Sequence, residues 1–143
     1  MTAGTSRLGR PVEIISFGYG HGPAPEAHAT FDVRRHFRDP HLHPALCDLM
    51  ATDTEVANAV IGTTGIPRLI VAMAAVTRAF RSGPEPGPVT VAVGCAGGRH
   101  RSAAIAMALA GLLRDDGTPV TVTHRDMDRP VIERPAESLG GRP

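Results

Sequence analysis

Short apolar runs rich in β-branched residues recur along the chain and predict β-strands. They lie at Val12–Phe17, Thr30–Val33, Val89–Val93 and Val120–Thr123. The third run is apolar at every position except Thr90, which is typical of a central strand that is covered on both faces. The pattern therefore predicts four strands, of which the third along the chain lies inside a sheet.

Three further segments have helical character. They are Thr54–Ile61, Pro67–Arg81 and Arg101–Arg114. Pro67 suits the first turn of a helix, and Ser82-Gly83-Pro84 is a stop signal. Because strands alternate with helices, we predict an α/β fold, with a small, mainly parallel four-stranded sheet and flanking helices.

The ordered domain is predicted to span residues 11–125. Residues 1–10 are interpreted as a flexible leader, and residues 126–143, with their scattered prolines, glycines and charges, as a disordered tail. A loop-rich span from Arg35 to Ala51 shows no clear periodicity. The length of 143 residues fits a single domain.

Charge and composition exclude several classes of protein. The chain has 15 basic residues, all arginine, against 14 acidic ones, with 42% apolar and 20% charged residues. This balance is typical of a soluble globular chain and argues against a strong non-specific nucleic-acid binder. The apolar runs are too short for a membrane span, the N-terminus lacks a secretory signal, and two cysteines are too few for a disulfide scaffold. We therefore expect a cytoplasmic protein that does not associate with membranes.

The segment Val89–Ser102 (VTVAVGCAGGRHRS) carries most of the chemical information. It places a glycine-rich turn between a buried strand and a helix, at the edge where parallel sheets bind ligands. Gly94, Gly97 and Gly98 allow positive φ and a close backbone approach to a ligand, and consecutive amides form anion nests. The helix N-terminus and the arginines favour a phosphoryl group or a similar oxyanion.

The candidate phosphate ligands in this segment are Cys95, Gly97, Gly98, Arg99, His100, Arg101 and Ser102. The alternative is an ordinary strand–helix turn that happens to expose arginines.

The same segment matches the C-x5-R-S pattern of cysteine-dependent phosphatases. Cys95 would be the nucleophile, Arg101 the phosphate clamp, and Ser102 the residue that assists the leaving thiolate. The general acid would be Asp32, Asp39 or Asp126. Those enzymes usually have a histidine before the cysteine, where this chain has Gly94. The alternative for Cys95 is a small buried residue that ends a strand.

Polar residues also follow the other predicted strands and would reach the same edge of the sheet. His21 comes after the first strand, and Asp32 and Arg34 lie at the second. His124 ends the fourth strand. These residues are candidates to bind a phosphate, a sugar hydroxyl or an amine. The alternatives are mutual pairing of Asp32 with Arg34 and a surface position for His21.

The spacing of the remaining histidines does not predict a metal site. His41 and His43 have only Cys47 as a nearby third ligand, and His28 and His36 complete no zinc-like pattern. We expect neither a metal nor a cofactor.

The chain resembles the C-terminal domain of the RapZ family of bacterial RNase adapter and nucleotide-binding proteins. The resemblance runs in order from about Val12 to Arg125 and rests on FGYGHG, FDVR, Asp39-Pro40, Pro44, Met50-Ala51-Thr52, VAVGCAGGRHRS and His124-Arg125. It implies an α/β domain similar to the sugar-phosphate-binding half of phosphofructokinase. It also implies recognition of glucosamine-6-phosphate and, in some members, of a small regulatory RNA. The ligand residues it implies are Cys95, Gly97, His100 and Arg101, with His21, Asp32 and Arg34.

Two features depart from the family pattern. The family usually has an N-terminal kinase-like domain with a Walker A P-loop, whereas this chain has no G-x4-G-K-[ST] motif and no lysine. ATP or GTP binding by that route is thus excluded for this chain. RNA-binding members have a basic end, whereas Arg125–Pro143 has four arginines and four acidic residues.

We therefore expect a non-catalytic module that binds and senses a phosphorylated amino sugar, such as glucosamine-6-phosphate, or a similar phosphometabolite. The alternatives are a cysteine-dependent phosphatase and an RNA-binding adapter that would use surface arginines. A protein partner and an oligomeric assembly are left open.

Overall fold

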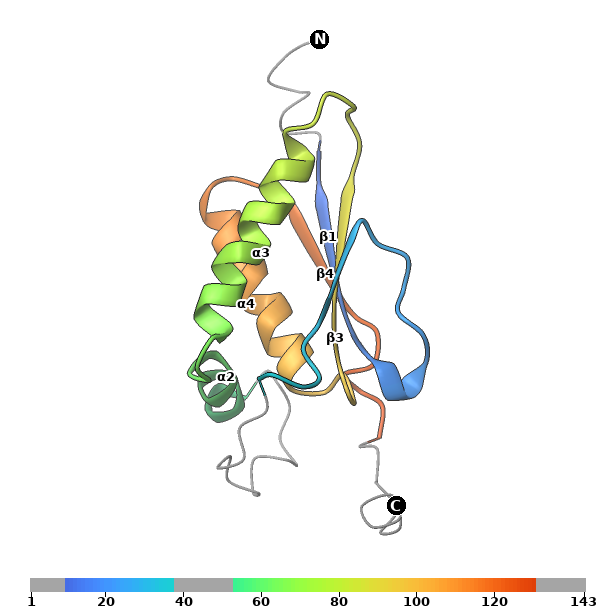
Figure 1. Cartoon of the computed structure of the whole chain (residues 1–143), viewed down its shortest axis with the longest axis vertical. Helices are drawn as coiled ribbons and strands as arrows, with labels where there is room; N and C mark the ends of the chain where they lie inside the picture. Colours follow the sequence, from blue (N-terminus) through green and yellow to red (C-terminus); the bar gives the residue numbers. More distant parts are fainter. Residues whose placement is uncertain (1–9, 38–52, 131–143) are drawn as a thin grey trace.

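The computed structural model describes residues 10–37 and 53–130 and shows a four-stranded sheet with helices packed on one face (Figure 1). The strands are β1 (Val12–Gly18), β2 (Ala29–Asp32), β3 (Val89–Cys95) and β4 (Val120–His124). The helices are α2 (Thr54–Ile61), α3 (Ile66–Arg81) and α4 (Arg101–Asp115), with a short 3-10 helix η1 (Tyr19–His21). The predicted α/β fold is confirmed, and the strand and helix bounds agree with the sequence pattern to within two residues.

All strand pairs are parallel, in the order β2-β3-β1-β4. The register places Gly18 beside Cys95, Asp32 beside Gly94, and Ser16 beside His124. Because the strands run the same way, their carboxyl ends form one edge. The turn after β3, the loop after β1 and the ends of β2 and β4 therefore lie along that edge.

The core fills the space between the sheet and the three helices. Val12 and Ile14 of β1 and Val91 and Val93 of β3 are fully buried. They face the same core as the buried aliphatic residues of the helices, which include Ile66, Met73, Ile105, Leu109 and Leu113. Burying each such side chain stabilises the fold by about 1.5–3 kcal/mol. The first half of α4 is rich in buried alanine, so this helix can lie close to the sheet.

The connection from β1 to β2 passes on the side of the sheet opposite the helices (Figure 1). On this face Phe17 is fully buried, and its ring meets Tyr19 edge-on with centroids 4.7 Å apart. The two rings lie against Gly94 of β3. Aromatic side chains thus cover the carboxyl end of the sheet on the face that has no helices.

Several sequence predictions fall outside the described residues. They concern residues 1–9 of the predicted leader, residues 38–51 of the loop-rich span with Asp39, His41, His43 and Cys47, and residues 131–143 of the predicted tail. The assignment of Asp126 to a disordered tail needs correction, because its side chain is fully buried. The folded part therefore includes this residue.

No single helix in residues 10–37 and 53–130 is long and apolar enough to cross a membrane. The pair α2 and α3 would suffice by combined length and composition, but it is bent by 84°.

Candidate functional site

The turn between β3 and α4 folds back over the end of β1. The Gly20 N–H donates to the Ala96 carbonyl oxygen at 2.9 Å. A Cβ added to Gly18 would lie 2.3 Å from the backbone carbon of Gly97, so the two segments touch through their main chains. Gly98 has φ +79°, in the left-handed region that favours glycine. Glycines on both segments thus permit this close contact.

The inner side of the turn is closed by internal hydrogen bonds. Cys95 is 3% exposed, and its Sγ accepts the Gly98 N–H at 3.2 Å. The Ser102 hydroxyl lies 3.2 Å from that sulfur and donates to the Phe17 carbonyl oxygen at 3.1 Å. Since the hydroxyl has one hydrogen, the thiol completes the chain by donating to Ser102 Oγ. Cys95, Gly98 and Ser102 are therefore engaged inside the protein.

The outer side of the turn is open at Gly97. A Cβ built on this residue meets no atom of residues 10–37 and 53–130 within 4 Å, and the φ of Gly97 lies outside the left-handed region. The next residues lead into α4, whose N-cap residue, His100, makes no capping hydrogen bond through its side chain. Amide hydrogens at such an uncapped helix start carry partial positive charge and lack partners within the helix. Within the described part of the chain, this side of the turn is therefore uncovered at Gly97.

Three basic residues flank the open side. Arg101 donates through Nη1 to the carbonyl oxygens of Val33 at 2.8 Å and Arg34 at 3.1 Å. It therefore ties the start of α4 to the chain just after β2, which the sequence did not predict. Arg99 and His100 are half-buried, and each already has an interaction within the protein.

Asp32 and Arg34 form an ion pair beside the turn. Arg34 Nη2 lies 2.8 Å from Asp32 Oδ2, and Arg34 Nε lies 3.0 Å from Oδ1. The guanidinium also stacks on Tyr19, 3.8 Å from the ring centroid. The hydrogen bond from Arg34 is the main reason that the pKa of Asp32 is lowered, so this carboxylate is ionised at neutral pH. Burial, followed by the charge of Asp32, raises the pKa of Tyr19.

The two candidate histidines have different surroundings. His21 Nε2 is buried and has no hydrogen-bond partner among the residues that the structure describes, and the neighbouring Gly20 holds this segment against the turn. His124 Nδ1 instead lies 2.6 Å from Ser16 Oγ on β1. Burial lowers the pKa of His124, although the charge of Asp128 opposes that shift. Because β1 lies between β4 and β3, His124 is set apart from the turn.

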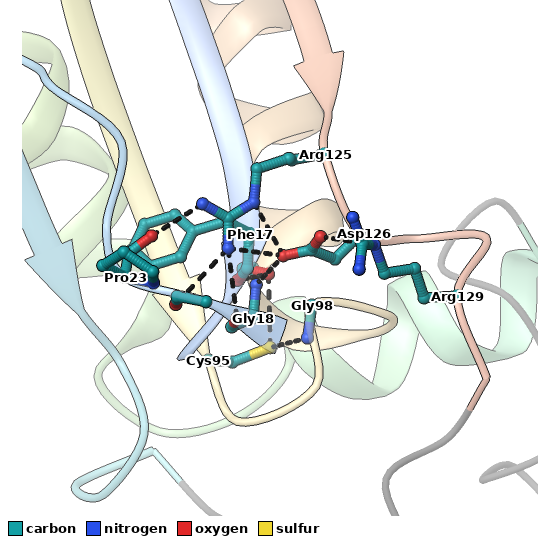
Figure 2. A network of polar contacts seen from close by, with 10 residues as sticks. Phe17, Gly18, Pro23, Cys95, Gly98, Arg125, Asp126 and Arg129 are labelled. Atoms are coloured by element: carbon teal, nitrogen blue, oxygen red, sulfur yellow. Dashed lines mark hydrogen bonds and ion pairs between the residues drawn. The ribbon is translucent and has the colours of Figure 1, made fainter. Parts of the chain in front are cut away.

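Sequence reasoning missed the role of the two residues that follow His124 (Figure 2). Asp126 Oδ2 accepts the Gly18 N–H at 2.8 Å and the Arg125 Nε–H at 3.0 Å. Burial alone would raise the pKa of Asp126, but hydrogen bonds from Arg125 and Gly18 and the nearby arginine charges outweigh it, so the pKa is lowered. The available signal was an arginine–aspartate pair directly after a strand, with Arg129 three residues further on.

Two open hollows lie elsewhere on the described surface and share His28. One, of about 520 Å³, is lined by Pro25–His28, Thr30 and Thr90. The other, of about 360 Å³, is lined by Phe80 and the proline-rich segment 83–89 as well as His28. Within residues 10–37 and 53–130, no three His, Cys, Asp or Glu side chains are grouped closely enough to hold a metal ion.

The fold and its edge define a small parallel α/β domain with a glycine-rich turn over its central strands. A family model described as the RapZ C-terminal domain matches residues 10–128, and the chain therefore belongs to the RapZ family. A nucleotide-binding protein of Sphingopyxis alaskensis is 38% identical over 143 aligned residues, covering 94% of this chain and 42% of the relative. A nucleotide-binding protein of Rhodospirillum centenum is 44% identical over 124 residues, covering 82% of this chain and 36% of the relative.

A third relative, a nucleotide-binding protein of Thermobifida fusca, is 37% identical over 119 residues, with 81% of this chain and 40% of the relative covered. The chain thus spans about two fifths of the length of these curated relatives.

Proposed function

We propose that this domain is a non-catalytic binding and sensing module for a phosphorylated small molecule, with the phosphate held at the turn Gly94–Ser102. The proposed ligand class is a phosphorylated amino sugar, for which glucosamine-6-phosphate is the probe. The observation that best supports this proposal is the open outer side of the turn at Gly97. It lies directly before the start of α4, where the N-cap residue makes no side-chain capping hydrogen bond.

The inner side of the turn has a structural role, and the outer side is the proposed ligand-binding surface. Gly98, Cys95 and Ser102 hold its shape from below. The amide of Gly97 and the first amides of α4 are left as the proposed phosphate donors, and their position at the helix start favours negative charge. Arg99 and Arg101 add positive charge around them, and His100 adds an imidazole ring. This arrangement supports an anion better than a neutral ligand.

The neighbouring polar residues fit the rest of an amino sugar. Asp32 is ionised, lies beside Gly94 in the sheet and keeps 44% of its side chain exposed, so its carboxylate would attract an ammonium group or accept from a hydroxyl. His21 Nε2 is buried without a partner, and a ligand oxygen or hydroxyl would satisfy it. Arg34 would keep Asp32 oriented through their two-point contact.

The burial of Cys95 favours a binding function over a catalytic one. A nucleophilic thiol has to reach the phosphorus atom, but this one is 3% exposed and lies under the turn between Gly98 and Ser102. The role that fits it is the packed end of a strand. A Cys95→Ser variant should therefore bind as the wild type does.

Calorimetric titration tests the proposal, with glucosamine-6-phosphate, glucosamine, inorganic phosphate and a mononucleotide as separate ligands. The phosphorylated sugar should bind most tightly, inorganic phosphate weakly, and glucosamine more weakly still. Tighter binding of the mononucleotide would move the ligand class to nucleotides, in keeping with the names of the relatives. No heat with any of the four would contradict the proposal.

Gly97→Ala gives a sharper test, because the structure has room for the methyl group but the proposed ligand does not. The variant should keep the stability of the wild type and lose about tenfold or more in affinity for glucosamine-6-phosphate. Gly111→Ala is the matched control, since it adds a methyl group to α4 in open space. Equal affinity of both variants would place the ligand elsewhere.

A further inference from the structure

Arg125 ties down the whole segment between β1 and the loop that leads to β2. Figure 2 shows its side chain reaching from the end of β4 across Phe17 to Gly18 and Pro23. Nη1 donates to the Pro23 carbonyl oxygen at 2.7 Å, and Nη2 donates to the carbonyl oxygens of Gly18 at 3.3 Å and Gly22 at 3.4 Å. One guanidinium thus holds both ends of the segment that contains His21.

This segment has little intrinsic rigidity. Gly18, Gly20 and Gly22 alternate with Tyr19 and His21, and η1 is a single turn without a side-chain cap. Glycine loses more conformational freedom on folding than any other residue, so a glycine-rich segment needs ties from outside. Arg125 restrains the segment through hydrogen bonds to its carbonyl groups, and the Ala96 carbonyl oxygen restrains it by accepting the Gly20 N–H.

Asp126 connects the same clamp to the glycine turn. Its buried Oδ2 receives both the Gly18 N–H and the Arg125 side chain. Gly18 in turn touches the backbone of Gly97 and Gly98. The carboxylate therefore fixes β1 at the place where the turn rests on it.

The other oxygen of Asp126 faces a different residue. Arg129 Nε lies 3.0 Å from Oδ1, in an ion pair that is not aligned as a hydrogen bond. Within residues 10–37 and 53–130, Arg129 contacts Asp126, whereas Arg125 also bonds the segment 18–23. The two arginines thus share one carboxylate but differ in whether they reach the site.

We propose that Arg125, anchored by Asp126, is a positioning residue of the ligand site, which holds the segment Gly18–Pro23 so that His21 stays beside the glycine turn. This inference rests on the proposed phosphate site. Without the clamp the ligand would have to order this segment on binding, and that ordering would weaken its affinity.

The test compares Arg125→Lys with Arg129→Lys in the full chain. Both variants keep the charge beside Asp126, but the donors of a lysine at position 125 all lie on one nitrogen and cannot reproduce the spread of Nη1 and Nη2 over the carbonyl groups of Gly18, Gly22 and Pro23. Arg125→Lys should lose about tenfold in affinity for glucosamine-6-phosphate, and the Gly20 amide should exchange its hydrogen about tenfold faster. Arg129→Lys should stay within about twofold of the wild type in both measurements.

A double-mutant cycle with His21→Ala separates positioning from a general loss of stability. If Arg125 acts through the segment that carries His21, the two affinity losses will not add. Additive losses, equal losses in the two arginine variants, or unchanged affinity in Arg125→Lys would each overturn the inference.

The exchange measurement also distinguishes the two proposals. If the wild type binds neither glucosamine-6-phosphate nor phosphate, the proposed function fails. Equal Gly20 exchange in the wild type and in Arg125→Lys overturns the clamp itself, whatever the binding result.

Discussion

Each glycine near the site has a different reason for being glycine. Gly94 lies in β3, where a Cβ would be 2.4 Å from the Phe17 ring. Gly98 has a left-handed backbone, and Gly97 faces open space. Sequence reasoning gave all three one role, backbone freedom near a ligand. The structure corrects this for Gly94, which is needed for packing on the face opposite the helices.

Gly94→Ala should therefore destabilise the fold. The added methyl group would clash with the buried ring of Phe17 and the half-buried ring of Tyr19, at a cost of about 1–3 kcal/mol in the free energy of unfolding. Urea denaturation measures this, with Gly111→Ala as the control. The control should be stabilised by about 0.4–1 kcal/mol, because alanine has less freedom in the unfolded chain. Equal stabilities of the two variants would mean that the rings of Phe17 and Tyr19 can move aside without a cost in stability.

Side-chain partners were only partly predictable from the sequence. Pairing of Asp32 with Arg34 was one of two open alternatives, and it is the one the structure shows. The burial of Cys95 was likewise one of the alternatives. The spacing of residues could not decide between pairing and ligand binding for Asp32 and Arg34, because an exposed ion pair and a ligand site use the same residue types. It could not decide the burial of Cys95 either.

Elements were more predictable than contacts. The apolar run of β3 and the proline and glycine signals around α3 depend on local periodicity and backbone preference, which act within a few residues. The start of α4 at Arg101 was also predicted, because two glycines precede it and alanines follow. The hydrogen bonds from Arg101 to Val33 and Arg34, just after β2, were not predicted, since they join segments far apart in the chain.

Arg101→Ala should loosen the junction of α4 with the segment after β2. Loss of the hydrogen bonds to Val33 and Arg34 should lower the free energy of unfolding by about 1–2 kcal/mol. Arg68→Ala, on the exposed side of α3, is the control and should change it by less than about 0.5 kcal/mol. Unfolding of the two variants at the same denaturant concentration would contradict this structural role.

The contact between β4 and β1 should make stability depend on pH. Burial lowers the pKa of His124 in the folded state below its ordinary value of 6.5, so the unfolded chain binds the proton more readily. Stability should therefore fall as the pH drops from about 6.5 through the folded pKa, and level off below it. Thermal unfolding of His124→Gln should show a weaker fall over this range. An unchanged slope would assign the effect to other groups.

At the scale of the whole molecule, the hardest feature to predict was the burial of Asp126. Its partner Gly18 is 108 residues away in the sequence, and only the parallel pairing of β4 with β1 brings them together. A charged residue next to prolines and other charges has the composition of a tail. Asp126 can nevertheless be buried because its charge is neutralised by Arg125 and Arg129.

The molecule gathers its chemistry at one edge because every strand ends there. The turn after β3, the segment after β1 and the Asp32–Arg34 pair converge on that edge through sheet register alone. The matched RapZ domain accounts for about two fifths of each curated relative, so the proposed ligand site concerns this domain and not their remaining length.

The most direct test of the phosphate site is a crystal structure of the protein grown with saturating glucosamine-6-phosphate. We expect density for the phosphate within hydrogen-bond reach of the Gly97 amide and the first turn of α4, with His21 turned to the ligand. Phosphate density in the hollow beside His28 and Thr90, with the turn at Gly97 vacant, would contradict it.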